Sequence, residues 1–146
     1  MDTGNKALIR DMNTRFILKM IIEKGPISRA DIAKLSGLTK ATVSAIVKLL
    51  LDRQLISETG SAATQVGRKP ILLKFRPESG YIIVFDIGRL ETTVLAADLC
   101  GHTVKTQTYT TPADKESLLP GLIRTAGYLK ETLPPSAYGV IGISIG

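Results

Sequence analysis

A short capped helix pattern, a glycine turn and a second helix pattern constrain the fold of this chain more than any other feature. The first pattern lies in PISRADIAKLSGL, where Ser28 precedes Asp31 by three residues. This spacing is typical of a capping box, which satisfies the free N–H groups at a helix start. Gly37 suits the left-handed residue just past a helix end. The pattern predicts a helix of about two turns, with Ile32 and Leu35 on its buried face.

The next pattern, in LTKATVSAIVKLLLDR, predicts a longer helix over residues 39–53. Thr39 is placed to cap it, and Leu38 to act as a buried spacer between the two helices. Two helices joined by a three- or four-residue turn containing glycine are the pattern of a helix-turn-helix. One face of the longer helix is aliphatic and predicts burial, while the opposite face is small and cationic. The aliphatic face comprises Val43, Ile46, Val47, Leu50 and Leu51, and the opposite face Lys40, Thr42, Ser44, Ala45 and Lys48.

A slim, cationic helix face fits the major groove of DNA. The groove is about 12 Å wide, so a helix can lie in it only if its outward side chains are short. The free N–H groups and the positive dipole end at the helix start also favour phosphate. We assign Lys40 and Thr42 to base edges or adjacent phosphates, and Ser44 and Lys48 to phosphates. An amphipathic helix whose polar face meets only water is the alternative.

The segments on either side predict a further helix and a hairpin. Upstream, NTRFILKMIIEKG predicts a helix from Asn13 with an apolar stripe, while residues 5–12 either extend it or form a separate turn. Downstream, LISETG and ILLKF predict two strands, with the polar stretch SAATQVGRKP between them. A hairpin directly after a helix-turn-helix is a wing. The stripe on the first helix comprises Phe16, Ile17, Met20 and Ile21.

The tip of the predicted wing is basic. Arg68 and Lys69 stand between a glycine and a proline. Such an arm can reach into a narrow minor groove, whose negative potential attracts arginine; a solvated turn is the alternative. The complete candidate set for DNA contact is Ser28, Arg29, Thr39, Lys40, Ala41, Thr42, Ser44, Lys48, Arg68 and Lys69.

From Pro77 onward the pattern predicts a sheet. YIIVFDIG, TTVLAADLCG and HTVKTQTYT predict three strands, and YGVIGISIG predicts a final buried strand. A helix is predicted over residues 116–131, starting as late as Ser117 because Pro120 is tolerated only in a first turn. One helix covers one face of such a sheet and leaves apolar surface bare. We therefore expect the chain to be part of a longer protein, or to need a partner. The helix's apolar positions are Leu118, Leu122, Ile123, Ala126 and Leu129.

The excess of positive charge lies in the first 80 of the 146 residues. Residues 1–80 hold 14 Lys and Arg against 7 Asp and Glu, whereas residues 81–146 hold 5 against 6. This asymmetry favours an anionic partner, either nucleic acid or an acidic membrane surface; a generally basic surface that aids solubility is the alternative that charge alone leaves open. We expect no membrane span and no secretion signal. Cys100 and His102 are the only residues of their kinds, so neither a disulfide nor a four-ligand zinc site is expected within one chain.

The pattern as a whole resembles a known family. GPISRADIAKLSGLTKATVSAIVKLLLDRQLISETG, followed by GRKP and then by DIG on a strand, resembles the transcriptional regulators of the ROK family (repressors, open reading frames, kinases). The resemblance extends from Asn13 to Gly146, and its most specific part is the spacing from SRADIA through TKATVS to GRKP. It implies an α+β chain with a winged helix-turn-helix DNA-binding domain over residues 1–76. Residues 77–146 would then begin an actin-like, sugar-kinase-type α/β lobe, left incomplete.

The resemblance also implies partners. Regulators of this family bind operator DNA as symmetric dimers or tetramers and respond to a sugar, a sugar derivative or a phosphotransfer protein. We therefore expect a cytoplasmic, sequence-specific regulator that represses sugar-utilisation genes, with double-stranded DNA and further copies of itself as partners. A structural zinc and a sugar effector are implied only for a longer member, because those sites would lie beyond Gly146. We assign no cofactor to this chain.

A ROK sugar kinase with an appended winged helix is the alternative function. In kinases of this family, the strand turn that corresponds to residues 86–88 continues as Gly-Thr and helps to hold ATP phosphate. Here Arg89 and Leu90 follow, so a bulky side chain replaces the glycine that lets backbone approach phosphate. We therefore expect no enzymatic activity. A winged helix used only for protein docking is a third interpretation, disfavoured because protein interfaces usually deplete Lys at their cores.

Overall fold

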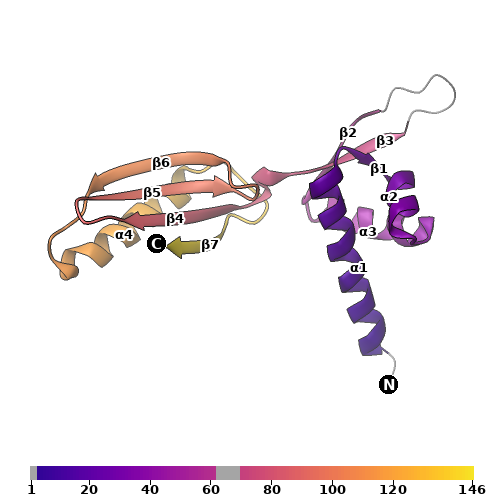
Figure 1. The fold of residues 1–146 in the computed structure, drawn as a ribbon, viewed down its shortest axis with the longest axis horizontal. Helices are drawn as coiled ribbons and strands as arrows, with labels where there is room; N and C mark the ends of the chain where they lie inside the picture. Colours follow the sequence, from indigo (N-terminus) through magenta and orange to yellow (C-terminus); the bar gives the residue numbers. More distant parts are fainter. Residues whose placement is uncertain (1–2, 62–69) are drawn as a thin grey trace. The chain divides into compact units, whose positions relative to one another are not determined.

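Among the residues that the structure describes, buried hydrophobic side chains form two clusters, and the chain divides between them. The computed structural model (Figure 1) describes residues 3–61 and 70–146. The division falls between Arg76 and Pro77, giving a first unit of residues 1–76 and a second unit of residues 77–146. Each cluster lies within one unit.

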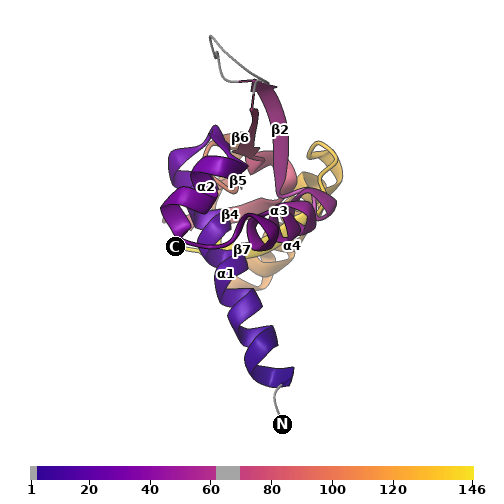
Figure 2. The ribbon, with the colours of Figure 1, turned by 90° about the vertical axis from the view of Figure 1, so that its right-hand side faces the viewer.

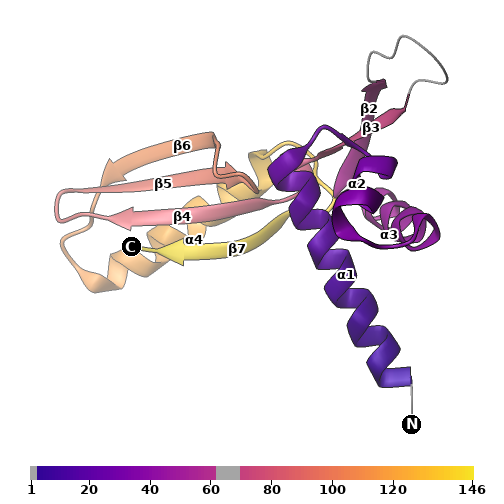
Figure 3. The same cartoon turned by 45° about the vertical axis from the view of Figure 1, so that its right-hand side comes forward.

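The described part of the first unit contains three helices (Figure 2, Figure 3). They are α1 (Thr3–Lys24), α2 (Arg29–Ser36) and α3 (Lys40–Asp52). Residues 5–12 therefore extend the first helix rather than forming a separate turn. Only the second half of α1 supplies side chains to the buried cluster, so its first half projects beyond the core.

Local hydrogen bonds explain where α2 and α3 begin and end. The Ser28 hydroxyl accepts the Asp31 N–H at 3.1 Å and donates to the Asp31 carboxylate at 2.6 Å, which caps α2. Gly37 follows α2 with φ of 69°, in the left-handed region that glycine adopts at little cost. Thr39 caps α3 by accepting the Thr42 N–H at 3.2 Å. These predicted caps are confirmed.

A three-stranded antiparallel sheet in order β1-β3-β2 completes the described part of this unit. The predicted hairpin is present as β2 (Ile56–Ser61) and β3 (Ile71–Phe75). The two-residue strand β1 (Ile27–Ser28) was not predicted, and it pairs with β3 where Ile27 lies opposite Leu73. Residues 62–69, which include the predicted wing tip with Arg68 and Lys69, lie outside the described residues.

The core of the first unit draws on all three helices and all three of these strands. Two predicted core positions are wrong, because Phe16 and Leu35 are exposed. Phe16 directly precedes the buried Ile17, so the helix turns it about 100° away from the core. On α2 the cluster packs against Ile32 and Ala33, which leaves Leu35 on the outer side. The buried residues are Ile17, Met20, Ile21, Ile27, Ile32, Val43, Ile46, Val47, Leu50, Ile56 and Leu73.

The second unit contains a four-stranded sheet in order β6-β5-β4-β7 among its described strands. A 3-10 turn (Pro77–Ser79) leads into β4. The antiparallel strands are β4 (Tyr81–Ile87), β5 (Glu91–Asp98) and β6 (Thr103–Thr110), as predicted. The last strand, β7 (Val140–Ile145), runs parallel to β4 at the end of the sheet.

Helix α4 (Lys115–Thr132) packs on one face of this sheet. Asp114 caps it by accepting the Ser117 N–H at 2.7 Å, so the helix begins before Ser117. Pro120 consequently lies inside the helix, in its second turn, and our expectation that the helix starts late enough to avoid this is wrong. The chain therefore forgoes the one intrahelical hydrogen bond that Pro120 cannot donate.

Strand β7 is not buried, contrary to the prediction. Ile141, Ile143 and Ile145 are exposed, as is Ile123 on α4. The reason lies in the topology, because the buried cluster forms where α4 covers β4 and β5, while β7 lies at the end of the sheet. Apolar surface is thus left bare beside α4. The cluster comprises Ile83, Phe85, Val94, Leu122 and Leu129.

Candidate nucleic-acid interface

Helix α3 presents a narrow outer face opposite its buried side. Its aliphatic residues lie in the core, and its capped N-terminus leaves the first residues in solvent. The first turn of α3 carries no acidic side chain, so nothing there opposes the approach of phosphate to the positive helix end. We call these outward residues the α3 face. It comprises the exposed residues Lys40, Ala41, Ser44, Ala45 and Lys48.

Thr42 and Thr39 are not part of the α3 face, because their side chains are engaged at the start of the helix. Thr42 is partly buried, and its hydroxyl lies 2.9 Å from the hydroxyl of Thr39. Thr42 also lines a hollow with residues of α1, so it lies toward α1 rather than directly outward, which corrects its predicted place on the outer face. Thr39 is exposed, but its hydroxyl already accepts the Thr42 N–H as the cap. Both residues thus shape the start of α3, next to the α3 face.

The two candidates at the start of α2 are engaged within the protein. Ser28 is only 3% exposed, and its hydroxyl makes both capping hydrogen bonds, so it leaves no side-chain surface for DNA. Arg29 forms an ion pair with Glu58 of β2, with 2.8 Å between Nη2 and Oε1. This pair joins α2 to the hairpin. We therefore remove Ser28 from the candidate interface and regard Arg29 chiefly as a link between α2 and the hairpin.

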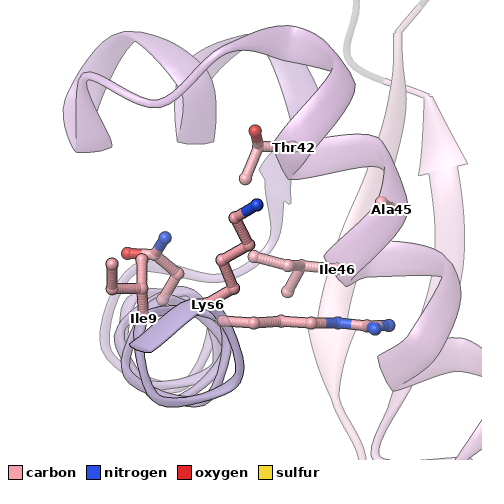
Figure 4. Close-up of a pocket in the computed structure, with 7 residues that line it drawn as sticks. Lys6, Ile9, Thr42, Ala45 and Ile46 are labelled. Atoms are coloured by element: carbon pink, nitrogen blue, oxygen red, sulfur yellow. The ribbon is translucent and has the colours of Figure 1, made fainter. Parts of the chain in front are cut away.

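A hollow of about 370 Å³ lies between α1 and α3 (Figure 4). Figure 4 shows the Lys6 side chain extending across it toward Thr42. Arg10, one helical turn further along α1, also lines it. Sequence reasoning missed both cations because α1 was traced with certainty only from Asn13. Their spacing of four residues was the available signal, since it places both on one side of a helix. The remaining lining residues are Ile9, Asn13, Ala45 and Ile46.

The turn between β4 and β5 bears on the alternative of phosphate transfer. The Gly88 N–H donates to the Glu91 carbonyl at 3.0 Å, and a Cβ at Gly88 would lie 2.8 Å from that oxygen. The hydroxyl of Thr92, a residue with no exposed surface, lies 2.9 Å from that of Thr111. Thr93 likewise lies within hydrogen-bonding distance of Thr108, at 3.2 Å. The glycine therefore serves a tight turn, and the nearby hydroxyls pair with each other across strands.

Within residues 3–61 and 70–146, no helix has the length and apolarity that crossing a membrane requires. The same ranges hold no group of three or more His, Cys, Asp or Glu side chains arranged to bind a metal ion. Cys100 is an exposed free thiol in the turn after β5.

The order α1-β1-α2-α3-β2-β3, with its slim exposed α3 face, defines the winged helix-turn-helix class. Residues 11–57 accordingly match the family described as winged helix-turn-helix DNA-binding. The chain is 32% identical over 146 residues to the xylose repressor of Bacillus spizizenii, covering 99% of this chain and 38% of that protein. It is also 30% identical over 116 residues to the N-acetylglucosamine repressor of Escherichia coli O157:H7, covering 80% and 29% respectively.

Solved structures agree with these sequence matches. A ROK family transcriptional regulator, described as a homolog of the E. coli MLC protein, superposes with a TM-score of 0.66 at 26% identity. The superposition covers 94% of this chain and 35% of that one. The chain is therefore homologous to the ROK-family transcriptional regulators. It spans less than two fifths of the length of the curated relatives that it matches.

Proposed function

We propose that this chain binds operator DNA as part of a cytoplasmic, sequence-specific repressor of sugar-utilisation genes. In this proposal residues 1–76 are the DNA-binding domain, and residues 77–146 begin an actin-like effector domain that responds to a sugar. The observation that carries it is the α3 face, whose exposed side chains are either small or cationic and whose first turn holds no carboxylate. The relatives named as xylose and N-acetylglucosamine repressors support the regulated class.

In the proposed complex α3 lies in the major groove. Lys40 and Ala41, at the start of the helix, approach base edges first, and Ser44 and Lys48 contact phosphates. The hollow between α1 and α3 adds two cations at the side of the groove. Lys6 and Arg10 are therefore proposed to contact the flanking phosphates, a role that the sequence alone did not suggest. Arg68 and Lys69 remain predicted contacts of the wing with the minor groove.

An enzymatic role is the less supported alternative. The turn after β4 carries Arg89 where a phosphate-binding turn would need a small residue, and the neighbouring threonine hydroxyls pair with each other. Sugar phosphorylation by a longer version of the chain would reverse this ranking. We infer that the second unit acts as a regulatory domain without catalysis.

Selection of duplexes from a randomised pool tests the proposal directly, because it reports binding, base preference and half-site spacing together. A symmetric dimer should select palindromes whose half-sites are about 34–36 Å apart. Affinity should fall steeply with salt, since roughly six to ten phosphates per dimer would be neutralised. Recovery of unrelated sequences, with an affinity independent of salt, would contradict the proposal.

A matched lysine pair tests the role of α3. Lys48→Ala should weaken binding to all duplexes and lower the slope of log K against log salt by about one unit. Lys130→Ala removes another exposed lysine, from α4 of the second unit, and should leave the slope unchanged. A separate change, Ala45→Phe, adds bulk to the α3 face and should abolish specific binding without lowering the midpoint of thermal unfolding. If Ala45→Phe unfolds the first unit, the wrong side of α3 has been assigned to DNA.

A further inference from the structure

The hollow between α1 and α3 is formed by two helix faces whose residues recur at helical spacing (Figure 4). On α3, Thr42, Ala45 and Ile46 are separated by three and four residues, which places them on one side of that helix. The α1 residues follow the same spacing, so each helix lines the hollow with one continuous face. The volume of about 370 Å³ lies in the range of about 300–1,000 Å³ that small-molecule sites occupy in proteins. The α1 residues are Lys6, Ile9, Arg10 and Asn13.

Part of the hollow is lined by apolar side chains, and we call Ile9, Ala45 and Ile46 its apolar wall. Ile46 belongs to the buried core of the first unit and is only 3% exposed, so packing holds it in place. Ile9 is 50% exposed and Ala45 is also exposed, so both can contact a molecule that enters. A phosphate group that contacts Lys6 and Arg10 gains nothing from apolar surface. The proposed contacts with DNA therefore leave the apolar wall without a use.

Positive charge is the second property of the hollow. Lys6 and Arg10 both line it, and Figure 4 shows the Lys6 side chain crossing it toward Thr42. Among the described residues that line the hollow, none is an Asp or a Glu. Asp11, although next to Arg10 in the sequence, does not line it and forms an ion pair with Arg15 at 2.9 Å. A negatively charged ligand therefore meets two cations, and both ammonium and guanidinium groups form strong hydrogen bonds with carboxylates.

We propose that this hollow binds a small amphipathic anion, an apolar body that carries a carboxylate, and that this ligand and DNA exclude each other. The apolar body lies against the apolar wall, and the carboxylate accepts hydrogen bonds from Lys6 and Arg10. A sugar fits poorly, because its hydroxyl groups would lose water against isoleucine side chains without gaining partners. The ligand therefore belongs to a different chemical class from the sugar proposed for the second unit.

The exclusion of DNA follows from residues that the two ligands share. Lys6 and Arg10 are the proposed contacts with flanking phosphates, so a carboxylate that occupies them removes those contacts. Ala45 belongs to both the apolar wall and the α3 face, so the apolar body adds bulk beside a helix that must be slim to enter the groove. The exclusion rests on the proposed function, whereas binding of the anion does not.

Three probes, titrated into the 146-residue chain without DNA and followed by amide NMR signals, test the ligand class. 1-Naphthoate has both the apolar body and the carboxylate, 1-naphthamide has only the body, and acetate has only the charge. Naphthoate should bind at least about tenfold more tightly than either of the others, because it makes both kinds of contact. Its signal shifts should cluster in α1 and α3. Equal affinity for naphthoate and either control probe, or shifts confined to other elements, would overturn the inference.

Matched variants test whether the probe binds in the hollow. Arg10→Ala should weaken naphthoate binding about tenfold, whereas Lys19→Ala removes an exposed cation of α1 outside the hollow and should leave it unchanged. Ile9→Gln removes part of the apolar wall without changing the charge, so naphthoate should bind about threefold more weakly while duplex affinity stays the same. Circular dichroism checks that α1 remains helical in all three. Equal naphthoate affinity in Arg10→Ala and Lys19→Ala would overturn the inference.

Competition is measured with a duplex recovered from the randomised pool. If the two ligands exclude each other, naphthoate at ten times its own Kd should raise the apparent Kd of the duplex about elevenfold. Acetate at the same concentration is the control for added salt, to which duplex binding is itself sensitive. A duplex Kd that is the same in naphthoate and acetate would overturn the exclusion. A chain that binds naphthoate in the hollow but no duplex would support the anion site and contradict only the proposed function.

Discussion

The two units of this chain have similar aliphatic content, but they differ in how completely other elements cover their aliphatic side chains. In the first unit three helices and a small sheet surround one core, and Ile17, Ile32 and Val47 have no exposed surface. In the second unit one helix lies on a four-stranded sheet, and the isoleucines of β7 remain exposed. An aliphatic pattern therefore identifies residues that can be buried, but burial itself requires an element on the other side.

The two units can be followed separately in one sample. All four tyrosines, Tyr81, Tyr109, Tyr128 and Tyr138, lie in the second unit, and the chain has no tryptophan. Near-ultraviolet circular dichroism of tyrosine therefore reports on the second unit. Far-ultraviolet helix signal reports mainly on the first unit, because α1, α2 and α3 are together longer than α4.

The largest expected effect is in the core of the first unit. Ile21→Ala should lower the free energy of unfolding of that unit by about 2–5 kcal/mol, since Ile21 is buried and leaves a cavity. The adjacent Ile22 is exposed, and Ile22→Ala should change it by less than about 0.5 kcal/mol. Denaturant unfolding followed by helix signal measures both. Equal losses of unfolding free energy in the two variants would show that Ile21 is no better covered than Ile22, contrary to the enclosed core described for the first unit.

The corresponding change in the second unit should be smaller. Leu129→Ala should cost about 2–3 kcal/mol, at the lower end for a buried leucine, because one helix on one sheet face can relax around the cavity. Ile123→Ala, on the exposed part of the same helix, serves as its control. The tyrosine signal should shift to lower denaturant for Leu129→Ala while the helix-dominated transition of the first unit stays in place. Coincident shifts of both transitions would mean that the units unfold together.

One glycine in each unit should respond oppositely to the same substitution. Gly37 has a positive φ at the end of α2, so Gly37→Ala should destabilise the first unit by about 1 kcal/mol. Gly127 lies within α4 and has open space where a methyl group would be added, so Gly127→Ala should stabilise the second unit by about 0.5–1 kcal/mol. Thermal unfolding of the two variants measures the signs, and a stabilising Gly37→Ala would contradict the left-handed cap.

The smallest effect concerns acid pH and the turn between β5 and β6. Burial opposes the ionisation of Asp98, but hydrogen bonds from the His102 ring and from the backbone N–H groups of His102 and Cys100 outweigh it, so the pKa of Asp98 is lowered. A lowered pKa contributes stability above the ordinary value of about 3.9, and this is lost as pH falls through the folded value. The free energy of unfolding of the second unit, measured by the tyrosine signal, should therefore fall below about pH 4. Asp98→Asn should reduce that dependence, and an unchanged acid profile would exclude this role.

Local signals were the part of the fold that the sequence predicted well. The caps at Ser28, Gly37 and Thr39 depend on residues within four positions of each other, so a single sequence contains all the information. Strand β1 was missed because its two residues form a strand only by pairing with β3, far along the chain. The exposure of β7 was missed for a similar reason, since strand order within a sheet is a long-range property.

The candidate interface was predicted only in part, because the sequence shows the spacing of residues on one helix but not which elements lie beside that helix. Helical spacing correctly separated the buried side of α3 from Lys40 and Lys48 on its outer face. It placed Thr42 outward because the sequence does not show that the first half of α1 lies beside it. The cations Lys6 and Arg10 were missed on the same account. Which face of a helix meets solvent depends on its neighbours as much as on its own sequence.

The terminal position of β7 has a practical consequence for handling the protein. A strand at the end of a sheet offers its outer backbone N–H and C=O groups as a template for a strand of another molecule, and bare isoleucines beside it favour such pairing. Concentrated solutions of this chain should therefore tend to aggregate through the second unit. Lysine in place of Ile141 or Ile143 would act as a gatekeeper, keeping the chain dispersed while the first unit is studied.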